Sequence, residues 1–179
     1  MRAHNAYRFQ RSPLRRTGTL ESYGAHMFPL DRLGAWPRLY GRAGFVQYQF
    51  AVPKGQERVL ERVIAALRRS SIPCYLAVLK DFGPAAPAPL SFPLEGWTLA
   101  LDMPAGVRGL GALLDACDEW VAGAGGRVYL AKDGRLRPGV VAAMYPRLEE
   151  WRAVRERHDP ERVWASDLAV RTGLVEDRS

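Results

Sequence analysis

The chain has 179 residues, of which 47% are hydrophobic and 10% aromatic. This length and composition exclude wholesale disorder and indicate one domain with a buried core, or one domain and a fragment. The net charge of +7 belongs to the N-terminal segment, because residues 1–42 hold eight arginines against two acidic residues while the rest of the chain is almost balanced.

Several site classes find no support in the sequence. No stretch approaches the roughly 20 apolar residues of a membrane span, and the N-terminus has no apolar signal core. Cys74 and Cys117 are interpreted as small buried hydrophobes in a reducing compartment. The three histidines lie too far apart for a local metal motif, so no metal site is predicted. We therefore expect a cytoplasmic protein, with peripheral membrane association left open.

Hydrophobic periodicity predicts six elements between residues 44 and 135. Period-two alternation predicts strands, and apolar stripes at helical spacing predict amphipathic helices. In chain order they are a strand at Gly44–Pro53, a helix at Gly55–Ser70, strands at Tyr75–Phe82 and Gly96–Met103, a helix at Val107–Ala124 and a strand at Arg127–Ala131. This order predicts an α+β fold, a ferredoxin-like βαββαβ antiparallel sheet with both helices on one face.

The first strand carries two glutamines whose position is informative. If Tyr48, Phe50 and their alternating partners face the helices, Gln47 and Gln49 face away from them. Strands favour branched and aromatic residues, so paired glutamines are unusual there. Either a solvated face or a polar floor for a ligand explains them.

A helical tail is predicted after the sheet. Helices are expected from Pro138 to Met144 and from Pro146 onward, and Asp159-Pro160 has the pattern of a cap followed by proline at the first helical position. The chain thus divides into a basic segment (1–43), a βαββαβ domain (44–135) and the tail (136–179).

Lysine is scarce, with Lys54, Lys80 and Lys132 against 23 arginines. A compact ammonium has a tunable pKa that a guanidinium lacks, so Lys132, after a short strand, is a candidate functional cation. A solvated lysine at a strand end is the other interpretation. The sequence contains no GxxxxGK[ST], GxSxG or HExxH motif, and the Gly-Ala-Gly-Gly at 123–126 follows a helix, which is the reverse of a dinucleotide fingerprint.

Five segments together resemble a known family: 28–53 (FPLDRLGAWPRLYGRAGFVQYQFAVP), 75–84, 89–104, 125–136 (GGRVYLAKDGRL) and 144–174. They are similar to the C-terminal part of FAD-binding oxidoreductases of the decaprenylphosphoryl-β-D-ribose 2′-oxidase family, in the vanillyl-alcohol-oxidase superfamily with an aldonolactone-oxidase-like C-terminal domain. The resemblance runs from about Tyr7 to Leu174.

The resemblance implies the function and the site. It implies oxidation of a secondary alcohol on a sugar or polyprenyl-phosphate sugar, with hydride passing to FAD, in cell wall arabinan biosynthesis. Lys132 would be catalytic and would contact the flavin together with Tyr129. The positions implied to bind substrate are Gln47, Gln49, Lys80, Leu76, Val78, Phe82, Thr98, Ala100 and Met27.

The resemblance also implies what this chain departs from. Family members carry asparagine and cysteine where Thr98 and Ala100 stand, and a tyrosine where Met27 stands, which leaves the sugar open. The family's FAD-binding domain has no counterpart here, so a truncated or split oxidase is expected, inactive and with little affinity for FAD by itself. An FAD-binding domain or chain, and a short-chain reductase, are the implied partners. Self-association through Trp151, Trp164 and Leu168 is expected.

Two alternatives of other classes remain. The basic N-terminal segment and the βαββαβ order are also typical of an RNA-recognition motif, and GFVQY echoes part of its aromatic signature. That signature belongs on the strand between the two helices, however, whereas Gly44–Tyr48 opens the first strand. We therefore expect no nucleic-acid partner. A non-catalytic interaction subunit or remnant is the other alternative.

Overall fold

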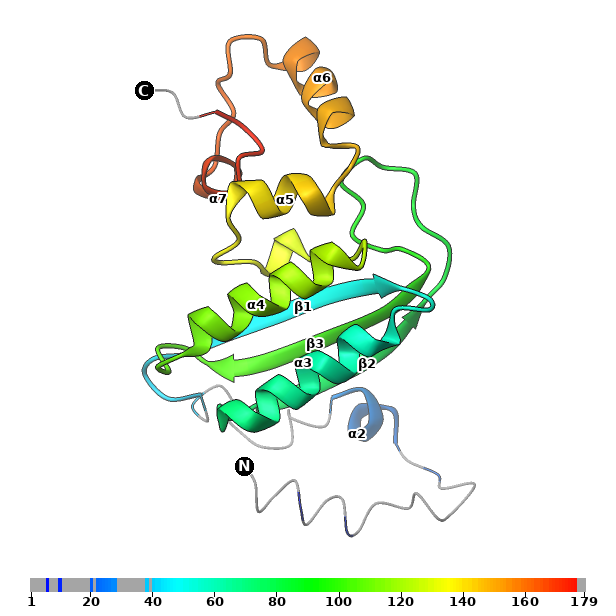
Figure 1. Cartoon of the computed structure of the whole chain (residues 1–179), viewed down its shortest axis with the longest axis vertical. Coiled ribbons are helices and arrows are strands. Elements are labelled where there is room, and N and C mark those ends of the chain that lie inside the picture. Colours follow the sequence, from blue (N-terminus) through cyan, green and yellow to red (C-terminus); the bar gives the residue numbers. More distant parts are fainter. Residues whose placement is uncertain are drawn as a thin grey trace. The chain divides into compact units, whose positions relative to one another are not determined.

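The computed structural model describes residues 40–176 continuously, with residues 22–28 and positions 6, 10, 20 and 38. The chain separates into two units, Met1–Gly44 and Phe45–Ser179. In the described part of the first unit, a short helix, α2, spans Tyr23–Met27. The second unit contains the sheet and the tail (Figure 1).

The second unit begins with the predicted alternation of strands and helices. The elements are β1 (Phe45–Pro53), α3 (Glu57–Ser70), β2 (Leu76–Phe82), β3 (Gly96–Pro104), α4 (Leu110–Gly123) and β4 (Arg127–Val128). The strands form one sheet in the order β2-β3-β1-β4, and every neighbouring pair is antiparallel. The predicted α+β class with an antiparallel sheet is confirmed.

Helices α3 and α4 cover the same face of the sheet (Figure 1). Tyr48, Phe50 and Val52 alternate along β1 toward them and are almost completely buried. Leu60 and Val63 of α3 and the apolar side of α4 join the same core, whose α4 members are Leu110, Leu114, Cys117 and Val121. The apolar stripes read from the sequence therefore mark the surfaces that hold this layer together, because burying apolar area is the dominant favourable term.

Two glycines end α4 for different physical reasons. Gly125 has a φ of 68°, a left-handed conformation that glycine adopts without a steric penalty. At Gly126 a Cβ atom would lie 2.5 Å from the carbonyl oxygen of Ala51 and 2.9 Å from that of Val121. The pair therefore reverses the chain and allows β4 to approach β1 closely.

The fourth strand is shorter than predicted. Tyr129 still donates its backbone N–H to the Gln49 carbonyl over 2.8 Å, but Leu130–Lys132 form a 3-10 helix, η2. The N–H groups of Lys132 and Asp133 donate to the carbonyls of Tyr129 and Leu130, closing this turn. The strand prediction for residues 129–131 was therefore wrong, and Lys132 lies on a turn.

The tail contains α5 (Pro138–Met144), α6 (Leu148–His158) and α7 (Asp167–Arg171). Val141 and Met144 of α5 belong to the main core, and Tyr145 donates its hydroxyl to the Val128 carbonyl over 2.6 Å. This part of the tail therefore packs on the sheet unit itself.

The helix start predicted at Asp159-Pro160 was wrong. The Asp159 carboxylate instead accepts the backbone N–H groups of Val163 and Trp164, at 2.7 and 3.1 Å, and holds a loop. The last helix begins at Asp167, after Ser166, whose hydroxyl accepts the Ala169 N–H. Both residue types are good caps, and the tertiary fold selects the later one.

Candidate functional site

The strand register gathers most of the predicted site residues on one surface. Residues directly opposite one another in adjacent strands share a face. Gln47 and Leu76 both lie opposite Asp102, Gln49 and Val78 both lie opposite Ala100, and Ala51 and Lys80 both lie opposite Thr98. We call the surface opposite α3 and α4 the far face; it comprises Gln47, Gln49, Ala51, Leu76, Val78, Lys80, Phe82, Thr98, Ala100 and Asp102.

Polar cross-strand pairs occupy the centre of the far face. The side-chain amide of Gln47 donates to Asp102 over 2.7 Å, and that of Gln49 donates to the Thr98 hydroxyl over 3.0 Å. The Thr98 hydroxyl in turn donates to the Phe50 carbonyl over 2.9 Å. Gln49, Thr98 and Asp102 are all buried, so hydrogen bonding between strands satisfies these groups where water does not.

Asp102 was missed as a site residue. A signal was present: the alternation of GWTLALDM places Asp102 on the same side of β3 as Thr98. The register then puts its carboxylate opposite Gln47. The register, however, follows from the folded sheet rather than from β3 alone.

Aromatic side chains cover one end of the far face. Phe92 and Leu94, from the loop between β2 and β3, pack with Ala51, Phe82 and Tyr129. The Phe92 and Tyr129 rings are stacked with centroids 4.5 Å apart, and Phe82 meets Phe92 edge to face at 5.7 Å. This end of the surface is therefore a rigid apolar wall beside the polar pairs.

Lys132 lies at this aromatic end. Its Nζ is 6.0 Å from the centroid of the Tyr129 ring, and its side chain is half-buried. Within residues 40–176 no carboxylate forms an ion pair with it. Within the described residues, the turn η2 thus presents an ammonium without a carboxylate partner next to the ring of Tyr129.

The remaining predicted residues are placed differently. Lys80 and Leu76 are exposed on β2, and Val78 and Phe82 are half-buried. Met27 is exposed in α2, which belongs to the first unit. In the tail, Trp164 is strongly exposed, whereas Trp151 and Leu168 are half-buried.

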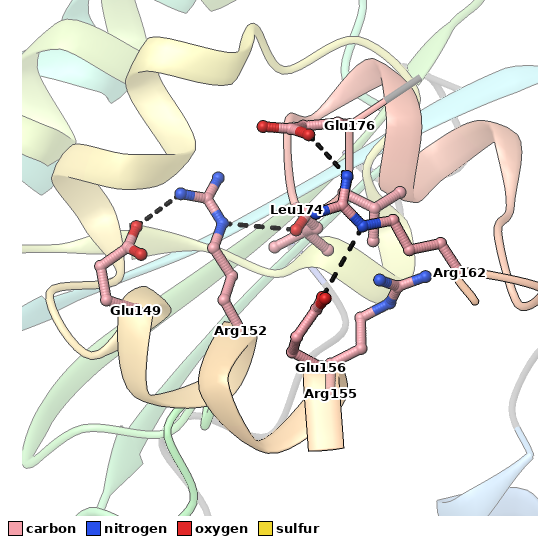
Figure 2. Close-up of a pocket in the computed structure, with 8 residues that line it drawn as sticks. Glu149, Arg152, Arg155, Glu156, Arg162, Leu174 and Glu176 are labelled. Atoms are coloured by element: carbon pink, nitrogen blue, oxygen red, sulfur yellow. Dashed lines mark hydrogen bonds and ion pairs between the residues drawn. The ribbon is translucent and has the colours of Figure 1, made fainter. Parts of the chain in front are cut away.

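A cavity of about 250 Å³ between α6 and the C-terminal segment is a second candidate site (Figure 2). Arginines and glutamates line it in pairs: Arg152 with Glu149, and Arg162 with both Glu156 and Glu176. Arg152 also donates to the carbonyls of Gly173 and Leu174. Because these charges neutralise one another, the cavity is best explained as a network that ties the end of the chain to α6.

Two other site classes find no support in the described part of the chain. No group of three or more histidine, cysteine or acidic side chains there could hold a metal ion. Among the helices that the structure describes, none has the length and apolar character needed to cross a membrane.

Comparison with known proteins identifies relatives of this chain. Residues 104–172, from the end of β3 to just after α7, match the sequence model of the D-arabinono-1,4-lactone oxidase family. The chain is also 44% identical over 147 residues to the decaprenylphosphoryl-β-D-ribose oxidase of Mycolicibacterium smegmatis, covering 82% of this chain and 32% of that protein. The predicted family resemblance is confirmed.

A second relative extends the match over more of the chain. It is an uncharacterized protein in the mprA 5′ region of Streptomyces coelicolor, 44% identical over 167 residues, which are 93% of this chain and 45% of that protein. The chain therefore spans less than half the length of the curated relatives it matches. The family segment contains Tyr129 and Lys132, whereas every residue of the far face precedes it in the sequence.

Proposed function

We propose that this chain is the substrate-binding part of an FAD-dependent oxidoreductase that oxidises a secondary alcohol of a sugar or a polyprenyl-phosphate sugar. The observation that carries the proposal is the position of Lys132 beside Tyr129 at one end of a sheet face lined with hydrogen-bonding side chains. Similarity to two kinds of sugar-derivative oxidase favours this function over an RNA-binding module. The strand order β2-β3-β1-β4 supports the ferredoxin-like interpretation of the sheet.

The residues at the aromatic end suit a flavin ring. FAD, when bound, accepts the hydride from the alcohol carbon and gains negative charge. A half-buried ammonium without a carboxylate partner among residues 40–176 would favour such charge, because water screens it less there than on a fully exposed surface. Tyr129 and Lys132 would hold this end of the flavin ring. The Phe92 ring, which is stacked on Tyr129, would fix the position of the Tyr129 side chain.

The polar pairs suit the sugar. Gln47 uses one amide hydrogen for Asp102, which leaves its second hydrogen and its carbonyl oxygen for a hydroxyl group. Lys80, exposed two cross-strand rows from Gln47 along the face, would attract a phosphate. The chain's own contribution is therefore to bind and orient the substrate and to supply a positive charge at the reacting end.

The proposal is tested with an FAD-binding domain supplied as a second chain or fused upstream, by stopped-flow measurement of flavin reduction at saturating sugar. Lys132→Ala is expected to slow reduction about 100-fold or more, the scale of losing one preorganised charge. Lys132→Arg should not restore the rate fully, because a planar guanidinium cannot take the place of a compact ammonium. Gln49→Ala and Lys80→Ala should mainly weaken substrate binding.

Lys54→Ala is the matched control, since Lys54 is exposed and forms an ion pair with Glu95 at the end of β1. It should leave both rate and affinity unchanged. These roles would be contradicted if Lys132→Ala reduced flavin at the parent rate while Gln49→Ala abolished flavin reduction.

The partners follow from the same proposal. A separate FAD-binding domain or chain would bind this one, and a short-chain reductase would act next on the oxidised sugar. The purified chain alone should be colourless, because the residues described above would contact only one end of the cofactor. An absorption spectrum showing one bound flavin per isolated chain would contradict the proposal that a separate domain is needed to bind the cofactor.

A further inference from the structure

The segment that follows Lys132 is held by buried charges. One carboxylate oxygen of Asp133 accepts the backbone N–H groups of Arg135 and Leu136, both over 2.9 Å. Its other oxygen accepts a hydrogen bond from the Arg171 guanidinium of α7 over 2.8 Å. The Asp133 side chain is 3% exposed and that of Arg171 is 34% exposed, so the carboxylate is buried while the guanidinium is partly open to water.

Arg135 connects the same segment to α4 and β1. Its Nη1 lies 2.6 Å from one carboxylate oxygen of Asp118, and its Nη2 contacts Asp115 one turn earlier on α4. The other oxygen of Asp118 accepts the hydroxyl of Tyr48 over 2.9 Å. Asp118 is 1% exposed, so a carboxylate is buried in the core at the cost of its hydration.

Stability alone does not explain this network. A buried ion pair often contributes no more than well-packed apolar residues would, because removing two charges from water offsets their attraction. Geometry does explain it, since η2 has only three residues and is closed by two backbone hydrogen bonds, from Lys132 to Tyr129 and from Asp133 to Leu130. So short a turn depends on what anchors it.

We propose that Asp118 and Arg135 are positioning residues that fix the turn carrying Lys132 against α4. The proposal rests on the proposed function for what Lys132 does, whereas the anchoring of the turn is tested without any flavin. The anchor resembles the supporting residues of other sites, which hold a reacting group in place through a second set of hydrogen bonds.

The experiment is amide hydrogen exchange, followed by NMR, in the chain and its variants. The reporters are the backbone amides of Lys132, Asp133, Arg135 and Leu136, each hydrogen-bonded within the turn. Asp118→Asn and Arg135→Met should each speed exchange at these amides about tenfold or more through local opening. Amides in the middle of α3, such as Val63, should keep the parent rate.

Arg137→Gln is the matched control. Arg137 also links this segment to α4, through Glu119 at 3.8 Å, but both side chains are largely exposed, so its loss should not change exchange in the turn. If the turn amides of Asp118→Asn exchange at the same rate as in the parent, the proposal is overturned. An equal acceleration in α3 and in the turn would also overturn it, because that result reports only global destabilisation.

Arg135→Lys provides a second variant if Asp118→Asn does not fold. A lysine keeps the positive charge but cannot contact both carboxylates with separate nitrogens, so exchange in the turn should rise while α3 stays protected. Exchange equal to the parent in this variant would also overturn the anchoring role.

Kinetics with an FAD-binding domain separate the two proposals. Asp118→Asn should lower the rate of flavin reduction at saturating sugar while the dissociation constant of the sugar stays at the parent value. If Lys132→Ala has no effect on flavin reduction but Asp118→Asn still loosens the turn, the proposed function fails and the anchor stands. If exchange is unchanged while Lys132→Ala slows reduction, the function stands and the anchor fails.

Discussion

Both faces of the sheet are buried in the second half of β1, but they are buried by different means. Toward the helices, Phe50 is completely inaccessible and belongs to the main hydrophobic core. On the far face its neighbour Gln49 is only 7% exposed, yet it is hydrogen-bonded to Thr98. Burial itself therefore does not distinguish the two faces; the chemistry of the buried side chains does.

The difference has an energetic consequence. Apolar side chains on the helix face contribute in proportion to the area they remove from water. A neutral hydrogen bond such as that of Gln49 contributes only about 1 kcal/mol net, and its unpaired groups are costly to bury. Polar pairs at the centre of a sheet are thus a weak way to gain stability, which is consistent with a role in binding.

The largest effect is expected on the helix face. Phe50→Ala removes a fully buried ring from the main core and leaves a cavity, so the free energy of unfolding should fall by about 3–5 kcal/mol. Urea unfolding followed by circular dichroism measures the change. Ile64→Ala, on the exposed side of α3, is the control and should cost far less. A loss below about 1 kcal/mol for Phe50→Ala would contradict the assignment of this face as the core.

The next largest expected effect is a pH dependence of the free energy of unfolding, which originates between the sheet and the helices that cover it. Burial raises the pKa of Asp118 from 3.8 to about 7, with the hydrogen bond from Tyr48 acting in the opposite direction. The folded protein therefore binds this proton more tightly than the unfolded chain does. The resulting stabilisation is fully present below about pH 4 and is lost as the pH rises through about 7.

Asp118→Asn isolates this contribution, because an amide keeps the shape of the carboxyl group but does not titrate. Between about pH 5 and about pH 8 the parent should lose on the order of 3 kcal/mol of unfolding free energy more than the variant loses. Urea unfolding of both proteins at the two pH values gives the difference. Parallel pH profiles would show that Asp118 stays ionised throughout, paired with Arg135.

The sequence was sufficient to predict the helix face and most of the order of elements. Periods of two and of 3.6 residues record which side of each element is buried, so β1, α3 and α4 could be located to within a few residues. The end of β4 could not, because the apolar run at residues 128–131 suits a strand, whereas backbone hydrogen bonds from Lys132 and Asp133 close a turn there. Local cap patterns at Asp159 and Ser166 are equally good, so they did not determine where the last helix begins.

The site divides in the same way. Alternation placed Gln47 and Gln49 on the face away from the helices, where the structure has them, because a face is a local property of a strand. The partnership of Tyr48 with Asp118 joins residues 70 apart in the sequence, and that of Gln47 with Asp102 joins residues 55 apart. Such pairings depend on the register and packing of the whole sheet, which no short pattern encodes.

A moderate effect is expected at the centre of the far face. Gln49→Ala deletes the donor to Thr98 and leaves space at a buried position, so unfolding free energy should fall by about 1–3 kcal/mol. Gln49→Met is the matched variant, since it fills the same volume without a hydrogen bond and should cost less. If Gln49→Met were as damaging as Phe50→Ala, the far face would be part of the structural core and the contrast between the faces would fail.

The smallest effect is expected at the edge of the far face. Lys80 lies in the same cross-strand row as Thr98, but it is exposed whereas Thr98 is 1% exposed. Lys80→Ala should therefore change unfolding free energy by less than about 0.5 kcal/mol, while Thr98→Ala, which removes two hydrogen bonds, should cost more. Thermal unfolding of the two variants side by side gives the comparison. If Lys80→Ala is neutral for stability yet weakens sugar binding once an FAD-binding domain is present, Lys80 serves the ligand alone. A loss above about 1 kcal/mol would instead make Lys80 a structural residue of β2 and remove it from the site.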